Sequence, residues 1–152
     1  MGTRSLTFVY DEMYGRQRKP KVITNMYRQY DGYPSGHGAE LAAFLSQFEM
    51  CNGIPVGEPT EKKYANGMGC LAAQMISNFK VGAGQFYIYP AGAVDCGQDY
   101  EYHVYKKDKE VRVRITDRGC NMFGLTMSDK NEALFDGTVA EFTAFCTAEE
   151  MA

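Results

Sequence analysis

Apolar residues recur at every second position in the first part of the chain. Leu6, Phe8 and Tyr10 follow this alternation, which is typical of a half-buried strand. A charged stretch with a proline, residues 16–21, then predicts a turn. Residues 22–30 have the composition of a returning strand. We therefore expect an N-terminal β-hairpin.

A helical period replaces this alternation after residue 40. One apolar stripe has the spacing i, i+3, i+4 and i+7 and consists of Leu41, Phe44, Leu45 and Phe48. The sequence Cys-Asn-Gly at residues 51–53 is expected to end this helix. A polar loop over residues 52–66 should lead to a second helix, whose core face consists of Leu71, Met75, Ile76 and Phe79.

Strands return in the second half of the chain, at residues 85–89, 100–106 and 111–116. A two-residue turn at 108–109 would join the last two as a hairpin. Its register pairs Val104 with Val113 and Tyr102 with Ile115 on one face. The other face then pairs Tyr105 with Arg112, His103 with Arg114, and Glu101 with Thr116.

A capping box at Thr138 and Glu141 starts a third helix, with Val139, Phe142 and Cys146 as its stripe. The order is ββαα, then three or four strands, then α. It predicts an α+β fold, an antiparallel sheet of five to six strands with about three helices on one face. Neither linker nor repeat interrupts the sequence, so we expect one domain over residues 1–152.

Composition narrows the class of protein. A chain of 152 residues is long enough to bury a core, and its net charge of −3 argues against a bulk nucleic-acid binder. No apolar run has the length of a membrane span, and the N-terminus lacks the pattern of a secretory signal. We therefore expect a soluble cytoplasmic protein, in the host cytoplasm if it is viral.

Five cysteines are widely spaced and form no CxxC pair: Cys51, Cys70, Cys96, Cys120 and Cys146. Since zinc sites need closely spaced ligands, the sequence predicts reduced thiols, no metal site and no cofactor. Cys70 has two interpretations. At a helix start the dipole would activate its thiol, whereas a small buried cysteine simply packs.

Residues 27–38 (YRQYDGYPSGHG) concentrate the chemistry of the chain, with three glycines in seven residues before a helix. Glycines let backbone approach a ligand, and amides at a helix start attract anions. The candidate ligand-binding residues are Arg4, Arg28, Tyr30, Asp31, Tyr33, Ser35 and His37. We expect an exposed Arg28 to bind phosphate or carboxylate, and the segment to line the main cavity. The alternative is structural, because Asp-Gly and Pro-Ser-Gly are also common turn sequences.

The first 50 residues or so also carry a resemblance. The opening MGTRS, the hairpin that leads into YRQYDGYP and the SGHG before the helix resemble a group of small uncharacterised proteins of phages and bacteria. The group brings no established activity. Its setting implies an accessory role in infection, such as sequestering a host signalling nucleotide.

Three functions remain open. The first is a non-catalytic binder of a small phosphate-bearing ligand, in particular a nucleotide. The second is a protein-interaction module with a tyrosine-rich surface, which leaves homo-oligomerisation open. The third is a nucleotide-processing hydrolase in which His37 acts as general acid or base, oriented by Asp31 or Glu40. The face with His103, Tyr105, Arg112 and Arg114 is expected to meet water, free for a ligand or a subunit.

Overall fold

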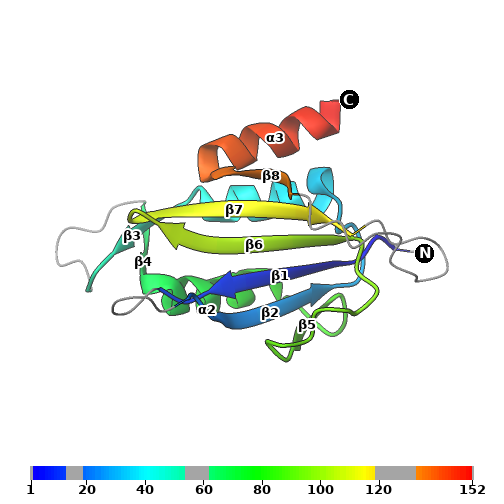
Figure 1. The fold of residues 1–152 in the computed structure, drawn as a ribbon, viewed down its shortest axis with the longest axis horizontal. Coiled ribbons are helices and arrows are strands. Elements are labelled where there is room, and N and C mark those ends of the chain that lie inside the picture. The colour runs from blue at the N-terminus through cyan, green and yellow to red at the C-terminus, as the bar shows by residue number, and fades with distance from the viewer. Residues whose placement is uncertain (1, 13–18, 54–61, 119–132, 152) are drawn as a thin grey trace.

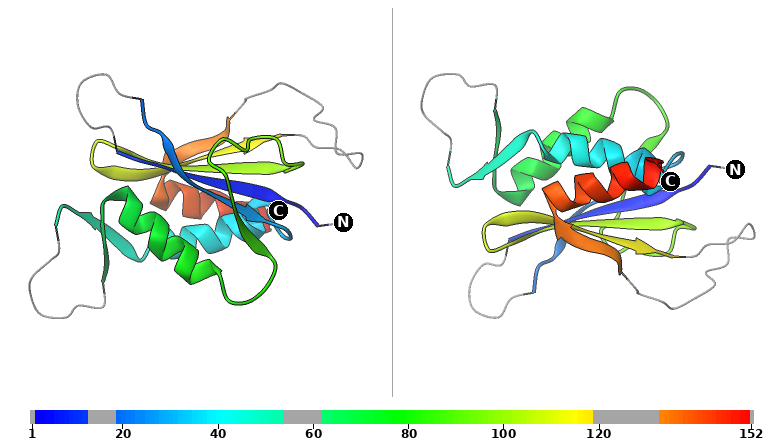
Figure 2. Two further views of the ribbon diagram at one scale, coloured as in Figure 1. Left: turned by 90° about the horizontal axis from the view of Figure 1, so that it is seen from below. Right: turned by 90° about the horizontal axis from the view of Figure 1, so that it is seen from above.

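A six-stranded sheet with helices on one face dominates the part of the chain described by the computed structural model, residues 2–12, 19–53, 62–118 and 133–151 (Figures 1 and 2). In spatial order the strands are β5 (Phe86–Tyr89), β2 (Val22–Arg28), β1 (Ser5–Tyr10), β6 (Tyr100–Lys107), β7 (Glu110–Asp117) and β8 (Ala133–Thr138). All neighbours are antiparallel except β1 and β6, which are parallel. The predicted α+β class with a mostly antiparallel sheet is confirmed.

Both predicted hairpins are present. β1 pairs with β2, and the β6–β7 pair has the predicted register, with Val104 opposite Val113 and His103 opposite Arg114. Positive φ angles at Asp108 (52°) and Lys109 (67°) give the two-residue turn a backbone twist that suits a hairpin. The alternation of aliphatic residues therefore determined this register correctly.

The first helix is shorter than predicted. A π-helical turn, η1 (Pro34–Gly38), runs into α1 (Ala39–Leu45). Phe48 instead begins β3 (Phe48–Cys51), which pairs in parallel with β4 (Lys63–Asn66) inside the predicted loop. The Phe48 ring still lies 4.8 Å from the ring of Phe44, between centroids. The apolar stripe thus marked a shared core, although it crosses the end of the helix.

The other two helices agree with the sequence. In α2 (Gly67–Phe79), three of the four predicted core residues are buried and Ile76 is half-buried. Phe142 and Cys146 of α3 (Val139–Met151) are fully buried. The capping box forms, since Glu141 N donates to Thr138 Oγ1 and Thr138 N donates to Glu141 Oε1. No helix in the described part of the chain is long and apolar enough to cross a membrane.

Both faces of the sheet carry buried side chains. On the helix side, Thr7, Val9, Met26 and Val104 contribute to the core beneath α1, α2 and α3. On the opposite side, Leu6, Phe8 and Tyr27 form a second apolar cluster. The alternating residues of β1 therefore mark the face away from the helices, and the polar Thr7 points toward them.

The face with His103, Tyr105, Arg112 and Arg114 is less open than predicted, because all four residues are half-buried. His103 stacks on Phe8 with ring centroids 5.2 Å apart, and its Nδ1 lies 2.7 Å from the hydroxyl of Tyr10. Burial, together with the charge of Arg114, lowers the pKa of His103 to about 4. This histidine is a neutral packing residue at physiological pH.

Candidate functional site

His37 lies inside the protein rather than on its surface. Its side chain is fully buried, and its ring packs edge-on against Tyr102 with centroids 5.1 Å apart. Nε2 lies 2.8 Å from Thr7 Oγ1, and Nδ1 lies 3.2 Å from Arg28 Nη1. A guanidinium only donates hydrogen bonds, so Nδ1 accepts and the ring proton is on Nε2. Desolvation, then the charge of Arg28, lowers the pKa of His37 to about 3.

Arg28 is also buried, which corrects the expectation of an exposed cation. Arg28 lies at the end of β2 and is 3% exposed, and its guanidinium carbon lies 5.1 Å from the centroid of the Phe86 ring. Nε donates to the carbonyl of Tyr30, and Nη1 donates to His37 and to Glu40 Oε2, the latter at 2.5 Å. Nη2 has no hydrogen bond to any residue that the structure describes.

The glycines of the segment serve chain packing. A Cβ added to Gly36 would lie 2.4 Å from the carbonyl oxygen of Asp31. A Cβ on Gly32 would meet the backbone of Arg4 and Ser5, at 2.8 Å from the nearest atom. The close approach that glycine allows is therefore to the chain itself, contrary to the interpretation that a ligand comes close here.

Three of the remaining candidates of the segment are exposed, and the fourth is half-buried. Tyr30 is 49% and Tyr33 38% exposed, and Asp31 is exposed with a positive φ of 58°. The Tyr33 hydroxyl donates to Asp31 Oδ1 at 3.3 Å. Ser35 is half-buried within η1. The candidate residues are therefore neighbours in the sequence, but some belong to an internal hydrogen-bond network and the others lie at the surface.

Arg4 does not join Arg28. Arg4 Nη1 lies 3.1 Å from the position of a Cβ on Gly97, and its charge acts on the hydroxyl of Tyr27. Tyr27 belongs to the cluster on the face opposite the helices, whereas Arg28 faces α1. Consecutive residues of a strand point to opposite faces, and this separates the two arginines.

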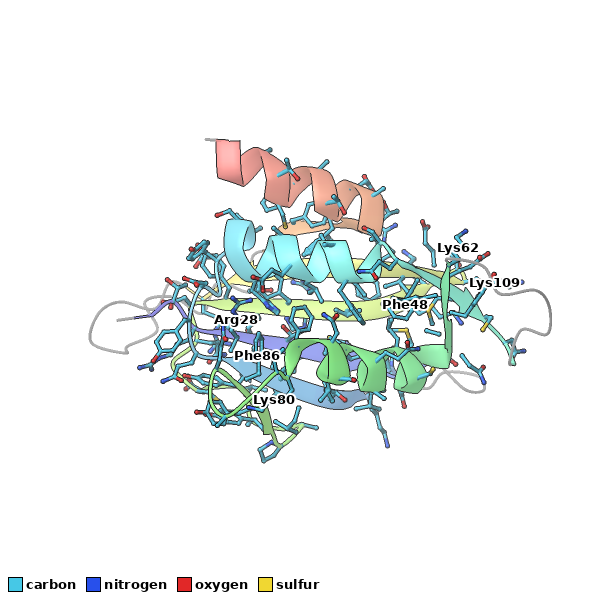
Figure 3. The ribbon with its side chains drawn as sticks, turned by 180° about the vertical axis from the view of Figure 1, so that it is seen from behind. Arg28, Phe48, Lys62, Lys80, Phe86 and Lys109 are labelled. Atoms are coloured by element: carbon cyan, nitrogen blue, oxygen red, sulfur yellow. The ribbon has the colours of Figure 1, made fainter. Side chains whose placement is uncertain are left out.

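A cavity of about 410 Å³ lies between α1, the C-terminal end of α2 and the start of β5. We call it the α1–α2 cavity. Its lining includes a charged pair, three rings and three amides, namely Arg28, Glu40, Phe44, Phe79, Phe86, Gln47, Asn78 and Gln85. Figure 3 shows Arg28 beside Phe86 at this end of the sheet, with Lys80 close by. Arg28 is the link between the buried network and this cavity.

Three cavities formed by the described residues do not support the prediction that residues 27–38 line the main cavity. Two other cavities, each of about 500 Å³, are lined by β3, the β6–β7 turn and neighbouring elements, without any residue of this segment. Only Arg28 of the segment lines the α1–α2 cavity. The amides Gln47, Asn78 and Gln85 were missed, because single polar residues near the ends of helices and strands carry no distinctive pattern.

The four cysteines that the structure describes form no second site. Cys70 is the fourth residue of α2, is half-buried, packs against the core and accepts a hydrogen bond from Gln74 Nε2 at 3.4 Å. The four described cysteines are free thiols, and Cys120 lies outside the described residues. In the described ranges, no group of three or more histidine, cysteine or acidic side chains is placed to hold a metal ion.

Comparisons with models of protein families, with curated proteins and with solved structures give no significant match. The function must therefore be argued from the geometry of the site.

Proposed function

We propose that this protein binds a small anionic ligand in the α1–α2 cavity and leaves it chemically unchanged. The observation that supports this most strongly is Arg28, a cation that is 3% exposed, lines the cavity and keeps Nη2 without a hydrogen bond to any described residue. Glu40 already pairs with the charge of Arg28, and the Nη2 donors that remain at the cavity wall are suited to an anion.

The rest of the lining indicates the class of ligand. Phe44, Phe79 and Phe86 line the cavity from the core, each 3–8% exposed, and their neighbouring ring centroids are 5.4 to 5.8 Å apart. Small-molecule sites of 300–1,000 Å³ typically combine such apolar walls with a few polar groups. A ligand with an aromatic group and a phosphate or carboxylate fits both parts. A nucleotide belongs to this class, and its sequestration is the form of the proposal that the phage resemblance implies.

The state of His37 favours binding over catalysis. Both ring nitrogens are engaged, the side chain is fully buried, and a pKa of about 3 keeps it neutral near pH 7. A general acid or base must reach the proton that it transfers. His37 instead supports Arg28, because its Nδ1 accepts from Nη1 and thereby orients the guanidinium.

The test adds a charge to the cavity without changing Arg28. Asn78→Asp places a carboxylate in the lining, and Ser77→Asp places the same charge one residue away, at an exposed position outside the lining. Phenyl phosphate is titrated into each protein and followed by NMR chemical shifts. Repulsion of about 1 kcal/mol should weaken binding about five-fold in Asn78→Asp and leave Ser77→Asp close to the unmodified protein. No saturable binding, or equal effects of both variants, would overturn the proposal.

A second candidate function, a protein-interaction module, is favoured by the surface around β5. Val81 is 89%, Ile88 57% and Tyr87 44% exposed. Exposed apolar residues on the edge strand of a sheet are one feature of interaction sites. If this surface joins two copies of the chain, sedimentation velocity should show a dimer that Ile88→Lys disrupts. A monomer at every concentration would exclude this form of the hypothesis.

A further inference from the structure

We propose that Glu40 is an internal competitor for the ligand: its carboxylate takes the place of the ligand's anionic group on Arg28, and binding displaces it. This inference rests on the proposed function. Glu40 Oε2 accepts from Arg28 Nη1 at 2.5 Å, and both residues line the α1–α2 cavity. A carboxylate and a phosphate bind a guanidinium in the same way, through oxygens in one plane with its N–H groups.

The two partners are held very differently. The Arg28 side chain is 3% exposed and is fixed by the carbonyl of Tyr30 and by His37 Nδ1. The Glu40 side chain is 55% exposed, and Arg28 is its sole hydrogen-bond partner among the described residues. The Glu40 side chain can therefore rotate toward the solvent at a small cost in free energy, whereas the Arg28 side chain stays in place. The arrangement gives a fixed receptor for an anion and a movable internal occupant.

This competition determines which ligands bind. An ion pair with one exposed partner is worth about 1 kcal/mol, so competition by Glu40 lowers the affinity for an anion by about five-fold. An intramolecular carboxylate also acts at an effective concentration in the millimolar range. Simple anions such as inorganic phosphate gain nothing beyond the contact that Glu40 already makes. A ligand that also packs against Phe79 and Phe86 gains apolar contacts that Glu40 lacks.

The experiment removes the competitor and keeps its shape. Glu40→Gln is compared with Glu49→Gln, which loses the same charge from a side chain of similar exposure (51%) in an ion pair with Lys62, outside the α1–α2 cavity. Each protein is titrated with inorganic phosphate and with phenyl phosphate by NMR. We expect Glu40→Gln to bind both probes about five-fold more tightly, and Glu49→Gln to match the unmodified protein.

The outcomes separate this inference from the function on which it rests. If phenyl phosphate binds and Asn78→Asp weakens it, but Glu40→Gln changes nothing, the competitor role is wrong and the binding function stands. If neither the unmodified protein nor Glu40→Gln binds either probe, the proposed function itself fails. Should Glu40→Gln not fold, Glu40→Asp provides the test, because its shorter side chain should reach Nη1 less well and also tighten binding. Unchanged affinity in that variant would overturn the inference.

Discussion

Acidification should destabilise this protein through His37. An unfolded histidine has a pKa of about 6.5, whereas folding lowers the pKa of His37 to about 3. Between these values the unfolded state binds a proton that the folded state excludes. The contribution of His37 to the free energy of unfolding is therefore fully present above pH 6.5 and is lost as the pH falls toward 3. From pH 7 to pH 5 the loss is about 1.36 kcal/mol per pH unit below 6.5, or about 2 kcal/mol in the free energy of unfolding.

The assay is urea unfolding at pH 7, 6 and 5 for the unmodified protein and for His37→Gln. The variant removes the titrating group, so it should lose about 2 kcal/mol less between pH 7 and pH 5. Carboxylates titrate in both proteins, and their contribution cancels in the difference. His103→Gln serves as a second comparison, since burial also lowers the pKa of His103, to about 4. If the free energy of unfolding of His37→Gln depends on pH in the same way as that of the unmodified protein, the conclusion that His37 is buried in its neutral form is refuted.

Four further substitutions test the packing by urea unfolding or sedimentation. Gly36→Ala should lower the free energy of unfolding by about 2 kcal/mol, because the methyl would lie 2.4 Å from the Asp31 carbonyl oxygen. Gly69→Ala, with nothing within 4 Å of its Cβ, should raise it by up to about 1 kcal/mol; equal effects would contradict this. Thr138→Ala should cost about 1 kcal/mol through loss of the α3 cap, and an unchanged midpoint would argue against it. Lys80→Met should increase self-association in sedimentation, since Lys80 Nζ donates to the Phe86 carbonyl at the β5 edge; a monomer at all concentrations would exclude that role.

The sequence predicted elements where one physical requirement dominates. Val104 and Val113 had to share a face, which determined the β6–β7 register. β3 and β4 were missed because they pair in parallel across a loop, and four-residue strands carry little periodicity of their own. Phe48 shows the same limit, since its spacing from Phe44 continued the stripe of a helix that ends at Leu45.

The sequence identified residues of the candidate site but did not predict which way their side chains point. Arg28 and His37 were identified, yet nothing in a string of turn residues says whether a side chain points inward. A signal existed in the strand itself. Met26 and Arg28 are two residues apart and therefore share a face, and Met26 is a core residue. Alternation alone would place Tyr30 on the same face as Arg28; Tyr30 is exposed because β2 ends at Arg28 and the regular pleat stops there.

The single parallel pairing in the main sheet should govern how the chain folds. Each half of this sheet contains a hairpin between sequence neighbours, and such hairpins form within about 1–10 μs. Among the described residues, the two halves of the sheet pair along β1 and β6, where the backbone N–H of Arg4 donates to the carboxylate of Asp99 across 95 positions of sequence. Closing so long a loop raises the contact order, so docking of the halves should limit the rate. Substitutions at this seam, such as at Val9 or Val104, should slow folding, whereas changes in the outer strands β5 and β8 should mainly speed unfolding.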